Sequence, residues 1–265
     1  MTVRRQHSWR KAVFAPLLCI CLTVCQLSSC SGLAVRPERE PGDGLLAIQL
    51  LAQLQAEGKS PDTYKGIGRF GLKGEKSSRS ARIAWAVTRS GALRLEIMGP
   101  TGQPQYTVAA DGHAITFISY QPYRFQRQKT KTMDLQDLLS VSISTSEIAD
   151  LLAGRIPETE YLSLHFERDP AGGEEALVLK SWWDRPVQKV YLKDGRTAFK
   201  AIEAFSFQGS LRYRVAFQKT RMINGFELPA ALLIENSKGE RITLTVDRFF
   251  PNAVLPEDLF SPGPA

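Results

Sequence analysis

Cysteine is scarce in this sequence of 265 residues, and all four cysteines lie within the first 30 positions. Three of them, Cys19, Cys21 and Cys25, belong to a segment that we expect to be removed from the mature protein. Cys30 then remains alone, and a single thiol cannot close an intramolecular disulfide. The folded part of the chain must therefore be stabilised by its hydrophobic core.

Residue clusters typical of catalytic or metal sites are also missing. His113 and His165 lie in separate segments, with no cysteine or carboxylate at metal-ligand spacing. Residues 209–211 (Gly-Ser-Leu) lack the second glycine of a nucleophile elbow. Residues 66–71 match GxGxxG, but a predicted helix precedes them where a dinucleotide site needs a strand, so a bent first strand is preferred. We predict a protein that is not an enzyme and needs no metal or cofactor.

One long uncharged apolar run occurs near the N-terminus, between residues 12 and 27. It is too short to be a comfortable transmembrane span. The basic residues that precede it are Arg4, Arg5, Arg10 and Lys11. This layout is typical of a secretory signal peptide, so we expect residues 1–29 to be removed.

The end of this segment, Leu27-Ser28-Ser29-Cys30, resembles the lipobox of bacterial lipoproteins. The resemblance implies cleavage before Cys30, with covalent diacylglyceryl and N-acyl groups (palmitate or a similar chain) on that residue. Two or more acyl chains anchor a protein stably in a membrane. Ser31 follows, where the inner-membrane retention signal of well-studied systems is an aspartate. The expected location is therefore the outer membrane, facing the periplasm.

The net charge of the whole sequence, +7, comes mostly from the segment that is expected to be removed. That segment holds four of the 34 basic residues and none of the 27 acidic ones, which leaves 30 basic and 27 acidic residues and a net charge of +3. Such a small charge favours no binding to nucleic acid. The expected partner is a membrane, reached through the lipid anchor.

The rest of the chain divides into a tether and one domain. Residues 30–43 are polar and rich in proline, and we expect them to carry the lipid and to form a flexible tether. Residues 44–57 have leucines at helical spacing and predict an amphipathic helix, with Gly58 as its C-terminal cap. We expect residues 44–260 to form a single β domain and residues 261–265 a short tail.

Apolar and polar residues alternate with a period of two after Pro61, which predicts strands with one buried face. Ser90-Gly91, residues 111–112 (Asp-Gly) and residues 224–225 (Asn-Gly) mark tight turns between them. Connections this short require antiparallel hairpins, because parallel pairs need a long crossover. The prediction is a mainly β (α+β) fold, in which about a dozen strands form one curved antiparallel sheet with helices on its concave side.

The alternation breaks between Met133 and Pro157, where two short helices are predicted. Ser144 and Glu147 have the spacing of a capping box, and Gly154 stands where the second helix ends. The apolar positions of these helices form the predicted lid: Leu135, Leu138, Ile148, Leu151 and Leu152.

Residues 93–102 (LRLEIMGPTG), 111–112 (DG), 151–157 (LLAGRIP) and 228–229 (LP) resemble the LolA/LolB family, especially the outer-membrane lipoprotein receptor LolB. The resemblance implies a half-open β-barrel with a helical lid around an apolar cavity for acyl chains, no bond-making chemistry, and a LolA-like periplasmic carrier as partner. It also makes Pro100 and Thr101 a candidate membrane-facing loop. Thr101 stands where LolB has an exposed leucine, which is a departure from the family.

Nine apolar residues at inward-facing strand positions are the candidate cavity lining: Trp85, Leu93, Leu95, Ile97, Tyr106, Phe117, Phe125, Leu164 and Phe217. An ordinary packed core is the alternative for each of them. A basic stretch around Phe125, made by Arg124, Arg127, Lys129 and Lys131, is interpreted as a solvated strand face or as a contact for anionic head groups. Trp182 and Trp183 are interpreted as core or rim packing, or as an interfacial contact.

The sequence thus predicts a monomeric outer-membrane lipoprotein that binds acyl chains and helps to receive or insert lipoproteins or lipids. The alternative is a structural or sensing lipoprotein of an envelope assembly, with the same fold and a cavity closed by side chains.

Overall fold

The computed structural model describes residues 43–57, 61–73, 78–168 and 173–264. These residues belong to one compact unit, Pro41–Ala265. The predicted signal peptide, the anchor Cys30, the tether and the predicted cap Gly58 lie outside the described residues.

Thirteen antiparallel strands form one sheet in the order β6-β5-β4-β3-β2-β1-β13-β12-β11-β10-β9-β8-β7. Consecutive strands of the chain pair with each other, except for β6 and β7, which lie at opposite edges of the sheet. The pairing of β1 with β13 joins the two meanders. The strands are β1 Thr63–Lys73, β2 Ser78–Thr88, β3 Leu93–Met98, β4 Pro104–Ala110, β5 Ile115–Tyr120, β6 Tyr123–Gln128, β7 Ser163–Arg168, β8 Glu175–Lys180, β9 Pro186–Leu192, β10 Phe199–Phe205, β11 Leu211–Ile223, β12 Phe226–Glu235 and β13 Arg241–Pro251.

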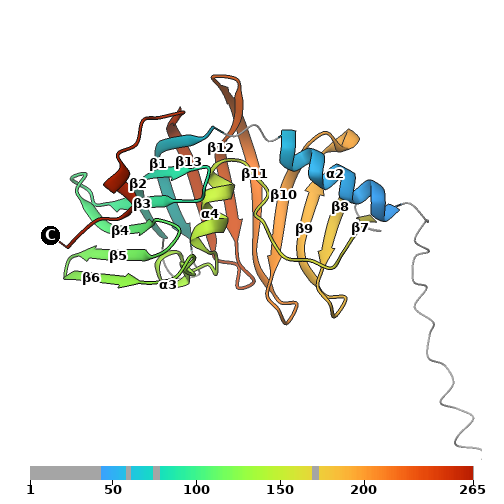
Figure 1. Ribbon diagram of the computed structural model, residues 1–265, viewed down its shortest axis with the longest axis horizontal. Helices are drawn as coiled ribbons and strands as arrows, with labels where there is room; N and C mark the ends of the chain where they lie inside the picture. The colour runs from blue at the N-terminus through green and yellow to red at the C-terminus, as the bar shows by residue number, and fades with distance from the viewer. Residues whose placement is uncertain (1–42, 58–60, 74–77, 169–172, 265) are drawn as a thin grey trace, which may run out of the picture. The chain divides into compact units, whose positions relative to one another are not determined.

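The sheet does not close, since β6 and β7 remain its two edges. The described helices are α2 Asp43–Glu57, α3 Gln136–Leu139 and α4 Thr145–Leu152, with the 3₁₀ turns η1 Asp194–Arg196 and η2 Glu257–Phe260. Figure 1 shows α2 and α4 lying across one face of the sheet. We name this the inner face and the opposite one the outer face. The predicted fold, a large open antiparallel sheet with a helical lid, is confirmed.

Alternation along the strands separates the two faces. In β1, Tyr64 and Phe70 are buried on the inner side, whereas Lys65 and Arg69 are exposed on the outer side. One large cluster of buried apolar side chains fills the space between the inner face and the helices. This cluster is the core that the disulfide-free chain needs.

The GxGxxG segment is part of β1, as the preferred interpretation predicts. Its register with β13 shifts between Ile67 and Gly68, because β13 contains one extra residue there, Asp247. The indole of Trp85 covers Gly66, where a Cβ atom would lie 2.2 Å from the ring. Gly68 lies against β13, and a Cβ there would be 2.5 Å from the carbonyl oxygen of Thr245. These glycines permit close packing within the sheet. The segment lies inside a strand and does not have the strand–turn–helix form of a dinucleotide-binding loop.

The predicted capping box at α4 is confirmed. The Ser144 hydroxyl accepts a hydrogen bond from the Glu147 backbone N–H, and the Glu147 carboxylate accepts one from the Ser144 backbone N–H. Gly154 follows the C-cap with φ at +74°, a conformation that glycine adopts without strain. Local sequence therefore fixes both ends of the short helix that crosses the inner face.

Candidate functional site

Helix α4 occupies the centre of the inner face. Its apolar side chains Ile148, Leu151 and Leu152 are buried in the same cluster as Trp85 and Leu93 of the sheet. The predicted lid residues of this helix therefore face the sheet, as a lid requires.

Three polar contacts hold α4 and the segment after it. The Tyr64 hydroxyl donates a hydrogen bond to the backbone carbonyl of Ala149. The Arg212 guanidinium donates two hydrogen bonds to the Glu147 carboxylate, at 2.9 and 2.8 Å. Arg155, just beyond the helix, forms an ion pair with Asp150 at 2.8 Å. Tyr64 belongs to β1 and Arg212 to β11, and these strands lie on opposite sides of β13, the central strand of the sheet. The helix therefore bridges the two halves of the sheet.

The two carboxylates of α4 have pKa values displaced in opposite directions. Burial raises the pKa of Glu147, but the hydrogen bonds from Arg212 and Ser144 lower it more, so the pKa lies below its usual value. Burial raises the pKa of Asp150 above its usual value, and Arg155 offsets only part of this effect. The bond between Glu147 and Arg212 is therefore the charged contact that persists over a wide pH range.

We expect Glu147→Gln to lower the free energy of unfolding by about 1–3 kcal/mol at pH 7. Because the folded pKa of Glu147 is depressed, its contribution is present above the unfolded pKa and is lost as pH falls through the folded pKa. The difference between wild type and variant should therefore shrink at about pH 3. Urea unfolding at both pH values measures it, and an equal difference at both would contradict the assignment. Asp150→Asn is the matched control and should show the opposite trend.

Two pockets with partly apolar walls lie on the inner face. The first, the β4–β5 pocket, has a volume of about 350 Å³. Tyr106 and Phe117 stack in its wall, with ring centroids 6.2 Å apart, and Met133, Leu135 and Leu138 from the α3 region line its other side. Polar lining is supplied by Arg79, Gln126, Asp134 and Asp137.

The second, the β10–β12 pocket, has a volume of about 300 Å³. Phe199 and Phe217 meet edge to face in its wall, with ring centroids 5.1 Å apart, and Leu54 of α2 and Pro229 of β12 also line it. Both pockets lie at the lower end of the range of small-molecule sites, 300 to 1,000 Å³ or so.

The nine candidate lining residues separate into three groups. Tyr106 and Phe117 line the β4–β5 pocket, and Phe217 lines the β10–β12 pocket. A second group is packed in the core or buried on the inner face without lining either pocket: Trp85, Leu93, Leu95, Ile97 and Leu164.

Phe125 forms the third group by itself. The prediction that it lines the cavity is wrong. Tyr120 pairs with Tyr123 across the β5–β6 turn, so Phe125 pairs with Ile118. The neighbouring pair, Phe117 and Gln126, faces the pocket, and successive residues of a strand point to opposite faces. Phe125 therefore lies on the outer face.

The sequence interpretation missed Met133, Phe199 and Leu54 as lining residues. Phe199 meets Phe217 from the adjacent part of the sheet, and Leu54 reaches the pocket from α2. Each is an apolar residue at a position that an ordinary packed core would also use. No local sequence signal distinguishes a pocket-lining residue from a core residue, because tertiary packing decides between them.

The remaining candidate residues are simple to place. His113 lies in the β4–β5 turn and His165 on β7, and among the described residues no group of three His, Cys, Asp or Glu could hold a metal. Arg124 and Arg127 lie on edge strand β6, where Arg127 pairs with Asp111 at 2.9 Å. Pro100 and Thr101 are exposed in the turn between β3 and β4.

Trp182 and Trp183 lie in the turn between β8 and β9, with 76% and 65% of their surfaces exposed. Their interpretation as core packing is therefore wrong. Among the described residues, no helix has both the length and the apolar character needed to cross a membrane.

Neither the protein-family models nor the curated protein sequences match this chain. Solved structures do. A DUF1329 family protein from Desulfovibrio piger ATCC 29098 has a TM-score of 0.61 at 8% identity, covering 83% of this chain and 97% of that one. A LolA superfamily protein from Nitrosomonas europaea has a TM-score of 0.59 at 15% identity, covering 82% and 97%.

A domain assigned to outer membrane lipoprotein sorting, from Vibrio parahaemolyticus, also has a TM-score of 0.59, at 10% identity, with coverage of 82% and 97%. The chain therefore has the LolA/LolB-like fold. At these identities the likeness concerns the fold alone.

Proposed function

We propose that this protein is a lipid-anchored protein of the bacterial outer membrane that binds acyl chains, of lipoproteins or of lipids, on the inner face of its sheet. Its role is LolB-like and non-enzymatic: it accepts an acylated cargo from a soluble LolA-like carrier and helps to insert it. Acylation at Cys30, a periplasm-facing position and a monomeric state are parts of this proposal. The lipobox-like segment and the fold support it.

One observation carries the proposal: two pockets with aromatic residues in their walls lie on the face that a short helix covers, and the buried side of this helix is itself apolar. If α4 moves outward, the apolar surface that it now covers becomes accessible to an acyl chain. An acyl chain would then replace the apolar contacts of Ile148, Leu151 and Leu152. Burying it would contribute about 25 cal/mol per Å² of apolar surface removed from water.

Transfer needs only a small difference in affinity between carrier, protein and membrane, because each of them buries the acyl chain. A lid that competes for the same surface suits such a balance, since it lowers the affinity for cargo by the free energy needed to displace it. The helix is eight residues long, and the contacts described above hold it in place.

Saturable binding of an acyl chain tests the proposal. All described elements lie in the compact unit Pro41–Ala265, so a chain that begins at Ser31 keeps the whole folded part and lacks the anchor. We expect native mass spectrometry of this chain to show retained lipid, or a fluorescent fatty-acyl probe to bind saturably and be displaced by palmitate. A lipid-free mass together with no probe binding would contradict the proposal.

The alternative function keeps one observation in its favour: α4 already fills the centre of the inner face. On this alternative the protein is a structural or sensing lipoprotein of an envelope assembly, and its pockets bind no acyl chain. The same measurement separates the two functions, because only the first predicts a bound lipid.

A further inference from the structure

Five large apolar side chains are exposed together at one end of the sheet. Trp182 and Trp183 lie in the β8–β9 turn, and Phe207, 72% exposed, lies in the β10–β11 turn. Tyr161 and Leu162, 42% and 62% exposed, immediately precede β7. We name these five residues the tip cluster.

Hydrogen bonds show that the three segments of the tip cluster are neighbours. The Leu162 N–H donates to the Lys180 carbonyl at 2.8 Å, which places Leu162 beside the end of β8. The Arg185 guanidinium donates to the Gln208 carbonyl at 3.3 Å, which links the β8–β9 turn to the β10–β11 turn. The three segments that carry the tip cluster therefore adjoin one another at this end of the sheet.

Both turns satisfy much of their own backbone. The Ser181 N–H donates to the Arg185 carbonyl at 2.9 Å, and the Asp184 N–H donates to the Ser181 carbonyl at 3.1 Å. In the other turn, Ser206 and Ser210 pair in the same way at 2.7 Å. Backbone groups that are already paired within a turn lose fewer hydrogen bonds to water when another surface covers the turn.

Charge at the tip cluster is nearly balanced. Lys180 forms an ion pair with Asp184 at 3.2 Å, and Arg185 bonds to a backbone carbonyl. A partner that presents a strongly charged surface would gain little here. Tryptophan and tyrosine side chains instead prefer the boundary between lipid head groups and acyl chains, where the ring is apolar and the N–H or O–H remains hydrated.

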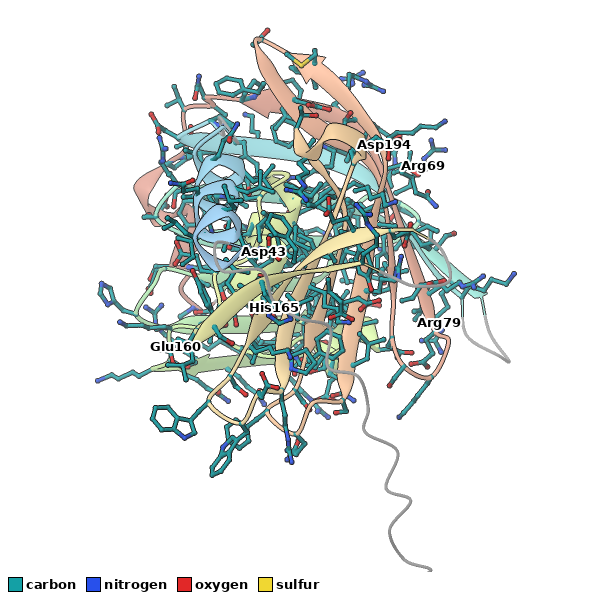
Figure 2. The ribbon with its side chains drawn as sticks, turned by 90° about the vertical axis from the view of Figure 1, so that its right-hand side faces the viewer. Asp43, Arg69, Arg79, Glu160, His165 and Asp194 are labelled. Carbon is teal, nitrogen blue, oxygen red and sulfur yellow. The ribbon has the colours of Figure 1, made fainter. Side chains whose placement is uncertain are left out.

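The start of the described chain lies on the same side of the sheet. A Cβ on Gly44, at the beginning of α2, would be 3.8 Å from the carbonyl oxygen of Leu164, two residues after Leu162. Figure 2 faces this side and labels Asp43, Glu160 and His165 on it. Residues 30–42 precede α2 and can span at most roughly 45 Å, at ~3.4 Å per residue. A chain anchored at Cys30 thus keeps the tip cluster within reach of the membrane.

From these observations we infer that the tip cluster is a membrane-docking surface that inserts into the head-group region of a phospholipid bilayer. Docking there is a second contact besides the lipid anchor, and it would fix how the inner-face pockets face the membrane. The inference rests on the proposed anchoring for proximity, and it does not depend on lipid binding in the pockets.

Tryptophan fluorescence tests it directly. The sequence has four tryptophans, and a chain that begins at Ser31 retains three: buried Trp85 and the two of the tip cluster. We expect vesicles of palmitoyl-oleoyl phosphatidylethanolamine and phosphatidylglycerol (3:1) to shift the emission to shorter wavelength. Brominated lipids should quench it, and the protein should sediment with the vesicles at both 50 and 300 mM salt.

The double variant Trp182→Ser/Trp183→Ser should bind the vesicles at least tenfold more weakly than the wild type does. The control Phe250→Ser/Val254→Ser, which replaces exposed apolar residues of the outer face, should keep wild-type affinity. Failure of the wild type to bind vesicles, or equal binding by the tryptophan variant, would overturn the inference and point to a protein partner. The tryptophan variant should still bind a fatty-acyl probe, so failure here is distinguishable from failure of the proposed function.

Discussion

Replacing Phe117 with glutamate should lower the affinity of the protein for a fatty-acyl probe by at least about tenfold, which corresponds to about 1.4 kcal/mol. Phe117 forms the wall of the β4–β5 pocket and stacks on Tyr106. A carboxylate there loses the stacking contact and places a charge against an acyl chain, which is costly without a partner. Phe117 is only partly buried, so the variant is expected to fold. Probe titration followed by fluorescence measures the effect.

Phe125→Glu is the matched control for this prediction. It makes the same substitution on the next strand, at a half-buried position of the outer face. It should leave probe affinity unchanged within about twofold. Circular dichroism and urea unfolding of both variants check that each is folded. Equal affinity in Phe117→Glu and wild type, with both folded, would exclude the β4–β5 pocket as the binding site.

The second large effect is expected on stability. Gly68→Ala should lower the free energy of unfolding by about 2–4 kcal/mol, because the new Cβ would lie 2.5 Å from the Thr245 carbonyl oxygen. That oxygen belongs to the backbone of β13, and β1 and β13 join the two halves of the sheet. The strands must move apart to admit the methyl group. Urea unfolding measures the change.

Gly71→Ala, in the same strand, is the control. Its Cβ would be 2.7 Å from the Thr243 hydroxyl oxygen, an atom of a side chain that can rotate. We expect a loss below about 1 kcal/mol. A Gly68→Ala variant as stable as wild type would show that the close approach of β1 and β13 is not a constraint.

Local patterns in the sequence predicted most of the fold. The alternation of Leu93, Leu95 and Ile97 places these residues on one face, and the turns at Ser90-Gly91 and at residues 224–225 connect antiparallel strands as expected. The capping box of Ser144 and Glu147 was also readable, because all of its atoms lie within four residues. Such features depend on neighbours in the chain, so sequence alone decides them.

The site was less predictable, because its parts come from distant segments. Whether an inward apolar residue lines a pocket or lies under α4 depends on where that helix crosses the sheet. Trp85 and Phe117 look alike in sequence, yet the first is packed in the core and the second lines a pocket. The face of Phe125 depends on the register across a short turn. The exposure of Trp182 and Trp183 follows from their place in a turn, which a two-residue alternation does not reveal.

The central claim, that an acyl chain binds on the inner face, is tested most directly by locating a bound chain. A photoreactive fatty acid can be cross-linked to the protein that begins at Ser31, and the labelled peptides identified by mass spectrometry. We predict saturable labelling, competed by palmitate, within residues 104–139 or 199–229, which carry the walls of the two pockets. Labelling confined to the outer-face groove around Phe250 and Leu255, or no saturable labelling, would contradict the account.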